Sequence, residues 1–143
     1  EPVMLSKPEY DWECRGFWVN EGPAVVMHGE RLFISYSASA TDENYCMGLL
    51  WIDIDADPRV PENWHKSPRP VFSTSYENRQ YGPGHNSFTQ TPEGEDVLVY
   101  HARNYTEIEG DPLYDPNRHT RLKLIRWDES GMPDFGIPPA ETY

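Results

Sequence analysis

Basic residues are scarce in this chain of 143 residues: Lys and Arg together number 12, against 24 Asp and Glu, and the formal net charge is −12. A nucleic acid attracts a basic surface that displaces counterions from its phosphates, and an anionic membrane attracts the same kind of surface. The charge balance therefore argues against both partners. Neutral polyols and sugars remain, and they suit a chain in which 13% of the residues are aromatic.

Long apolar runs and cysteines are scarce as well. No stretch approaches the ~20 apolar residues of a membrane-spanning helix. Cys14 and Cys46 are too few for a disulfide framework, and their spacing does not decide whether they pair. No signal peptide is visible, but the chain opens with Glu1 rather than Met, so it is expected to be a processed product or a fragment. The sequence leaves the compartment open, and we expect an extracellular or periplasmic protein.

Helical periodicity is also missing. Fourteen prolines, together with short runs of β-branched and aromatic residues, are typical of strands joined by turns. The length is that of one domain with one core, which we place at residues 1–143. The sequence thus predicts an all-β protein.

An internal repeat organises the chain. Residues 20–38 align with residues 85–103 at an offset of 65, and Gly29 then falls on Gly94. Each copy has a first short segment, a turn that contains glycine, and a second segment of mainly β-branched and aromatic residues. This is the pattern of a β-hairpin.

A further strand is expected after each hairpin, at residues 45–53 in the first copy and 120–128 in the second. The second copy is 11 residues longer, and the extra residues fall in the polar loop 104–120. Residues 66–75 are expected to form a fourth strand that closes the first unit.

Repeated units of three or four antiparallel strands favour β-propeller blades. We expect blade A at about 17–75, blade B at about 82–135 and a tail at 136–143. A β-sandwich is the alternative, because it also has short strands with turns. Two blades cannot close a ring, so the prediction is an incomplete propeller, completed by self-association or by an N-terminal half.

The repeat places Asn20-Glu21 and His85-Asn86 at matching points of two strands. In a propeller the first strand of each blade lies nearest the axis, so both pairs should converge on the central channel. The alternative for Glu21 is a strand-end carboxylate that accepts backbone hydrogen bonds, and the alternative for His85 is a structural histidine. The segment "GPGHNSF" is unusual, because two glycines and a proline bring the backbone close to another group.

Five blocks of sequence in order, "VNEGPAV", "YSASATDENYCMGLL", "GPGHNSF", "VLVYHAR" and "WDESGMPDFG", resemble glycoside hydrolase family 43. The resemblance is to its α-L-arabinofuranosidase-like members and runs over essentially the whole chain. It implies the C-terminal part of a five-bladed propeller that releases α-L-arabinofuranosyl or β-xylosyl units from plant cell-wall arabinan or xylan, with inversion. The sequence does not decide between the two sugars.

The resemblance implies that Glu21 is the general acid, with Gly22 and Pro23 fixing its position. The family's general base and a second, modulating Asp lie upstream of this motif. Asp11 is the only Asp before Glu21 in this chain, and its surroundings match neither motif. We therefore expect the isolated chain to be inactive.

The resemblance also implies binding roles for other residues. His85 matches a channel histidine that contacts a water or an ion, often calcium; oxygen ligands suit that cation better, so contact through water is expected. Arg118 and Arg121 are candidates for hydrogen bonds to sugar hydroxyls, and otherwise are solvated charges beside a strand. Trp18 is a candidate apolar floor under a furanose ring, or else a core tryptophan. Asn20 completes the predicted substrate contacts.

Further aromatic candidates for sugar contact, on weaker grounds, are Tyr36, Tyr81 and Tyr105. No cofactor is required by the inferred chemistry. Residues 53–57 (DIDAD) resemble the start of a calcium loop, but Pro58 stands where such a loop needs glycine.

Two other function classes remain open. One is a non-catalytic, carbohydrate-binding propeller, and the other is a structural module that binds no sugar. A carboxylate at position 21 favours the enzyme over both.

Overall fold

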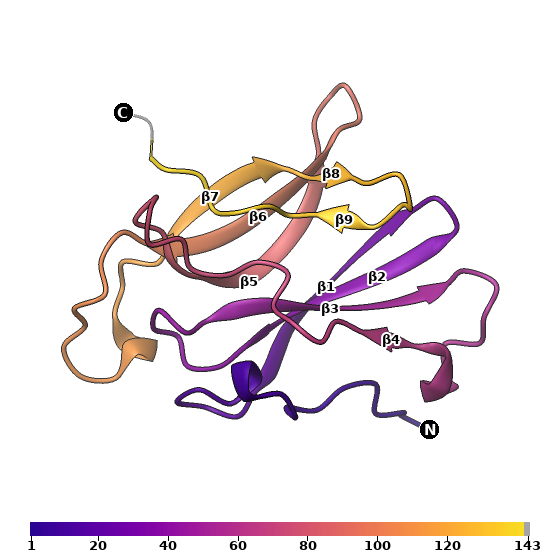
Figure 1. Cartoon of the computed structure of the whole chain (residues 1–143), viewed down its shortest axis with the longest axis horizontal. Helices are drawn as coiled ribbons and strands as arrows, with labels where there is room; N and C mark the ends of the chain where they lie inside the picture. The colour runs from indigo at the N-terminus through magenta and orange to yellow at the C-terminus, as the bar shows by residue number, and fades with distance from the viewer. Residues whose placement is uncertain (142–143) are drawn as a thin grey trace.

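The computed structural model of the chain describes residues 1–141, which form antiparallel β-sheets (Figure 1). The prediction of an all-β protein is confirmed: in the described part of the chain, the helical elements are short 3-10 turns. These turns are η1 (Asp11–Glu13), η2 (Pro61–Asn63) and η3 (Pro112–Tyr114).

The first sheet has four strands in the order β1-β2-β3-β4. Their bounds are β1 (Asn20–His28), β2 (Arg31–Ala38), β3 (Cys46–Asp53) and β4 (His65–Lys66). Each strand pairs antiparallel with the next along the chain. The sheet is therefore a meander, as expected for one blade.

The second sheet repeats this arrangement with three strands, in the order β5-β6-β7. They are β5 (Tyr81–Gln90), β6 (Asp96–Arg103) and β7 (His119–Leu124), followed by a two-stranded sheet of β8 (Arg126–Trp127) and β9 (Pro133–Asp134). Gly29 and Gly94 occupy the two hairpin turns with φ of 56° and 85°. Because such values suit glycine, the repeat found in the sequence corresponds to the two hairpins.

The expected fourth strand at residues 66–75 is only partly present. Strand β4 ends at Lys66, and beyond it Phe72 makes a single bridge to Met47. Pro68 and Pro70 explain the difference, because proline has no N–H to donate to the ladder.

The two larger sheets pack face to face around one core (Figure 1). Phe33 and Met47 of the first sheet are buried with Leu98 and Tyr100 of the second. The rings of Tyr100 and Phe72 form a T-shaped pair, with centroids 4.9 Å apart. This packing places β1 next to β5 and so aligns the two halves of the predicted site.

A smaller apolar cluster lies on the opposite face of the first sheet. There Trp12 and Leu5 of the N-terminal segment cover Tyr36 and Leu50. Cys46 is buried beneath this segment and Cys14 is half-buried, and both are free thiols. The structure thus contains no Cys14–Cys46 disulfide.

Apolar side chains remain exposed on both sides of the two-sheet unit. Val25 and Met27 are exposed on β1, and Leu122 and Leu124 are exposed on β7. Residues two apart on a strand share one face, so each pair forms an apolar stripe.

Candidate functional site

The starts of β1 and β5 bring Glu21 and His85 to one region. The two strands are in contact, and a Cβ added to Gly22 would lie 3.2 Å from the His85 ring. Gly22 has φ 55° and lies in an irregularity of the β1–β2 register between Glu21 and Ala24. This bend lets the backbone next to Glu21 lie directly against the imidazole.

Tyr45 holds the Glu21 carboxylate. Its hydroxyl donates to Glu21 Oε1 at 2.6 Å, and its side chain is fully buried. Burial, followed by this carboxylate, raises the pKa of Tyr45 well above its ordinary value, so the hydroxyl keeps its proton. The sequence does not single out this residue, because a tyrosine at the start of an expected strand (residues 45–53) has no distinguishing pattern.

The glycines of "GPGHNSF" are explained by Tyr45 and its neighbour Asp42. A Cβ on Gly84 would lie 2.4 Å from the Tyr45 ring, and one on Gly82 would lie 2.2 Å from the Asp42 carbonyl oxygen. The close approach expected from the sequence is therefore to these two residues. It allows β5 to press Tyr45 into place.

His85 is exposed and lines a hollow of about 580 Å³. Its backbone adopts φ 44°, and its N–H donates to Ser37 Oγ at 2.6 Å. Arg118 lines the same hollow, together with His101. The structure thus brings two predicted residues, His85 and Arg118, to one polar hollow.

His101 was not predicted, although the repeat placed it at the position of Tyr36. Its ring stacks on Tyr45 with centroids 5.6 Å apart and planes 4° from parallel. Burial, followed by the nearby charges of Arg118 and His85, lowers its pKa to about 4. The imidazole is therefore neutral near neutral pH, and Tyr45 lies between it and Glu21.

A second hollow, of about 230 Å³, adjoins Glu21 and is lined mainly by apolar groups. Phe17, Trp18 and Leu113 contribute side chains to it. Trp18 is 80% exposed, so it is not part of the core that residues 1–141 form by themselves.

Leu113 belongs to both hollows because the long loop of the second repeat passes over the site. Arg103, which is almost fully buried, anchors this loop: it donates to Asp115 Oδ1 at 2.8 Å, to the Pro112 carbonyl at 2.8 Å, and to the carbonyl of Thr41. Arg103, followed by Tyr105, holds the pKa of Asp115 below its usual range. The loop is thus a fixed wall of the site.

Two predicted contact residues lie elsewhere. The Asn20 amide donates to Glu13 Oε1 at 3.0 Å and accepts from Ser6 at 2.8 Å, so it is engaged within the fold. Arg121 forms an ion pair with Glu141 at 2.7 Å. The alternation of side chains along a strand explains why Arg121 lies away from the hollow of His101. Arg121 is paired with Tyr100, and neighbouring residues such as Tyr100 and His101 face opposite sides of a sheet.

The weaker tyrosine candidates also have partners within the fold. Tyr36 donates to Glu13 at 2.8 Å, and Tyr105 donates to Asp115 at 2.7 Å. Tyr81 packs edge-on against Tyr76. None of the three lines the two hollows beside Glu21.

Among residues 1–141 the surroundings of His85 offer no direct ligand set for calcium, and the expected contact of His85 with an ion through water stays a prediction. The neighbours of His85 in the hollow are an imidazole and the Arg118 guanidinium, and the carboxylate of Asp115 is taken by Arg103. Across residues 1–141, no group of three or more His, Cys, Asp or Glu could hold a metal ion. Oxygen ligands for calcium would have to come from outside the described residues.

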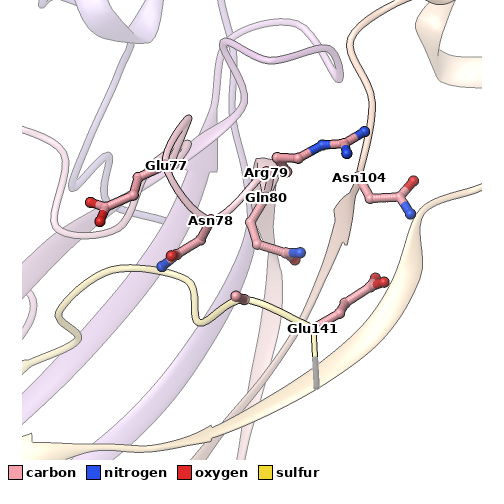
Figure 2. Close-up of a pocket in the computed structure, with 7 residues that line it drawn as sticks. Glu77, Asn78, Arg79, Gln80, Asn104 and Glu141 are labelled. Atoms are coloured by element: carbon pink, nitrogen blue, oxygen red, sulfur yellow. The ribbon is translucent and has the colours of Figure 1, made fainter. Parts of the chain in front are cut away.

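A separate polar hollow of about 290 Å³ lies between residues 77–80 and the C-terminal tail. Figure 2 shows Arg79 and Gln80 on one side and Glu141 on the other. Asn78 donates to the Pro138 carbonyl at 2.8 Å, which fastens the tail here. No predicted site residue lines this hollow.

Among the described residues, no helix is long and apolar enough to cross a membrane.

Comparison with protein families and curated proteins gives a consistent match. The family described as "Glycosyl hydrolases family 43" matches residues 1–133. The chain is 55% identical over 141 residues to an extracellular exo-α-(1→5)-L-arabinofuranosidase of Streptomyces avermitilis, and 53% identical over 137 residues to α-L-arabinofuranosidase 43 of Humicola insolens. These matches cover 98% and 95% of this chain, but it spans only 29% and 28% of those relatives.

Solved structures give the same result. The fold superposes on an α-L-arabinofuranosidase from Lactobacillus brevis with a TM-score of 0.98 and 58% identity, covering all of this chain and 44% of that one. A thermostable family-43 glycoside hydrolase matches with a TM-score of 0.74 and 27% identity, over all of this chain and 46% of that one. The prediction of a partial propeller is confirmed by these matches.

Proposed function

Because the chain belongs to glycosyl hydrolase family 43, we propose that it forms the C-terminal blades of an inverting α-L-arabinofuranosidase and supplies the general acid, Glu21. The position of Glu21 carries the proposal. It lies at the start of β1 beside His85, is held by Tyr45, and lines an apolar hollow.

Inverting hydrolysis needs two carboxyl groups about 6.5–9.5 Å apart. One protonates the leaving oxygen, and the other activates a water on the opposite face of the sugar. Glu21 suits the first role, because one of its oxygens is fixed by Tyr45 while the side chain lines an open hollow. The base belongs to blades outside this chain, so the chain alone does not turn over substrate.

The two hollows suit the two parts of a glycoside. Hydrogen-bonding groups of His85 and Arg118 line the polar hollow, and a guanidinium fork suits vicinal hydroxyls. Trp18 and Leu113 line the apolar hollow, where the CH face of a sugar can pack. The names of the relatives favour an arabinofuranosyl unit over a xylosyl unit, and one of them favours an extracellular location.

The test uses a complete propeller. In the Lactobacillus brevis enzyme, the segment that matches this chain is replaced by residues 1–143, and hydrolysis of α-1,5-linked arabinobiose and of p-nitrophenyl α-L-arabinofuranoside is measured. We expect Glu21→Gln to lower kcat on arabinobiose by about 10²–10⁴-fold, because its leaving group needs a proton. Nitrophenolate leaves without a proton, so kcat on the nitrophenyl substrate should fall little.

Equal turnover of arabinobiose by Glu21→Gln and the unmodified chimera would refute the proposal. The isolated chain serves as a second arm, in which we expect no hydrolysis of either substrate. A non-catalytic sugar-binding propeller is the second candidate, favoured by the two hollows, which can hold a sugar without any chemistry. It would give a chimera that binds arabinobiose without hydrolysing it, with and without Glu21→Gln.

A further inference from the structure

We propose that Tyr45 is a positioning residue for the general acid: its buried hydroxyl fixes Glu21 through Oε1 and leaves Oε2 to carry the transferred proton. This inference rests on the proposed function of Glu21. The hydroxyl donates to Oε1 at 2.6 Å, and among residues 1–141 no hydrogen bond reaches Oε2.

Close packing around the Tyr45 ring holds its hydroxyl in position. The side chain is fully buried. Gly84 presses on one part of the ring, so closely that a Cβ there would lie 2.4 Å away, and His101 stacks at 5.6 Å between centroids. Any side chain at position 84 would collide with the ring, so the glycine allows β5 to pack directly against Tyr45.

The chemistry requires a donor that never takes the transferred proton. Burial and the Glu21 carboxylate raise the pKa of Tyr45 well above its ordinary value, so its hydroxyl donates both before and after Glu21 protonates the leaving oxygen. His101 stays neutral, because its pKa is lowered to about 4. Hence the stack adds no charge beside the acid, and the acid is held in one orientation towards the leaving oxygen.

A matched control exists in the same chain. Tyr36 also donates a hydrogen bond to a carboxylate, Glu13 Oε1, at 2.8 Å, and its ring is also buried. That pair lies on the opposite face of the first sheet, beneath the N-terminal segment. Tyr45→Phe and Tyr36→Phe therefore remove the same kind of hydrogen bond and keep the ring, but only the first touches Glu21.

The first experiment measures side-chain order in the full 143-residue chain by NMR three-bond couplings. We expect one χ1 rotamer of Glu21 in the unmodified chain, rotamer averaging in Tyr45→Phe, and the unmodified value in Tyr36→Phe. Averaging in the unmodified chain would overturn the proposal without any variant, so it stays testable even where Tyr45→Phe fails to fold.

The second experiment measures kinetics in the chimera described above. We expect Tyr45→Phe to lower kcat on arabinobiose about 10–100-fold with little change in KM, and to leave hydrolysis of the nitrophenyl substrate nearly unchanged. Equal losses on both substrates, or the same loss in Tyr36→Phe, would overturn the positioning role. Glu21→Gln separates the two proposals: if it loses activity on arabinobiose and Tyr45→Phe does not, only the role of Tyr45 fails.

Discussion

Two carboxylates of the N-terminal region show how residue type alone leaves function open. Glu13 and Glu21 each accept a hydrogen bond from a buried tyrosine. Glu13 is fully buried and also accepts from the backbone N–H groups of Glu9 and Tyr10. The carboxylate oxygens of Glu13 therefore have their hydrogen-bond partners inside the fold, whereas Glu21 lines a hollow that a ligand can enter. Only the surroundings distinguish the structural carboxylate from the candidate acid.

Glu13 should therefore govern stability, and not chemistry. It forms an ion pair with Lys66 at 2.9 Å, and Lys66 also pairs with the more exposed Glu9 at 3.1 Å. We expect Glu13→Gln to lower the free energy of unfolding by about 3 kcal/mol, because it leaves a largely buried ammonium without its main partner. Glu9→Gln is the control and should cost less than about 1 kcal/mol. Urea titrations near neutral pH measure both, and similar values would contradict this account.

The same residue predicts a dependence of stability on pH. Burial alone would raise the pKa of Glu13, but hydrogen bonds from Tyr10, Glu9 and Lys66 outweigh burial and hold the pKa below its usual value. The folded state thus binds the proton more weakly than the unfolded chain. The contribution of Glu13 is complete above about pH 5 and is lost as the pH falls through the lowered pKa. Urea midpoints between pH 6 and pH 3 should fall less in Glu13→Gln than in the unmodified chain.

At the scale of elements, the loop that follows β6 determines the shape of the site. Arg103 ends that strand and reaches Asp115 and the carbonyls of Pro112 and Thr41. Arg59 and Asp57 form a second Arg–Asp pair, at 2.9 Å, but on the surface. We expect Arg103→Met to speed amide exchange in residues 104–118 at least about tenfold, because the loop loses its anchor. Arg59→Met should leave that exchange unchanged, and equal protection in both variants would show that the loop is held by other contacts.

Elements show most clearly what sequence could and could not predict. The two hairpins could be predicted because glycine at turns and alternating apolar residues are local signals. Only part of the candidate site could be predicted. A 65-residue repeat aligned Glu21 with Asn86, but Tyr45 and Arg103 act through contacts between distant segments, which spacing does not encode. Arg121 lines neither hollow, because the side that a strand residue faces depends on register: Arg121 pairs with Tyr100, one residue away from the face of His101.

At the scale of the whole molecule, the two blades form a slice of a ring. The first sheet ends in the edge strand β1, and the second ends in β7. Each carries an exposed apolar stripe, Val25 with Met27 and Leu122 with Leu124. In a closed propeller such faces are covered by neighbouring blades. The short span of this chain on its relatives fits a structure completed by further blades.

Without those blades, the stripes should drive self-association, because exposed apolar faces and open strand edges attract one another. We expect the chain of 16.6 kDa to elute in light-scattering chromatography at twice its mass or more, at concentrations of tens of micromolar. The double variant Val25→Lys/Leu122→Lys should shift it to the monomer. Val60→Lys, which changes an exposed valine in a loop, is the control and should leave the oligomer intact. A monodisperse monomer of the unmodified chain would mean that these apolar stripes do not drive association. The inference that other blades complete the propeller would then rest on the relatives alone.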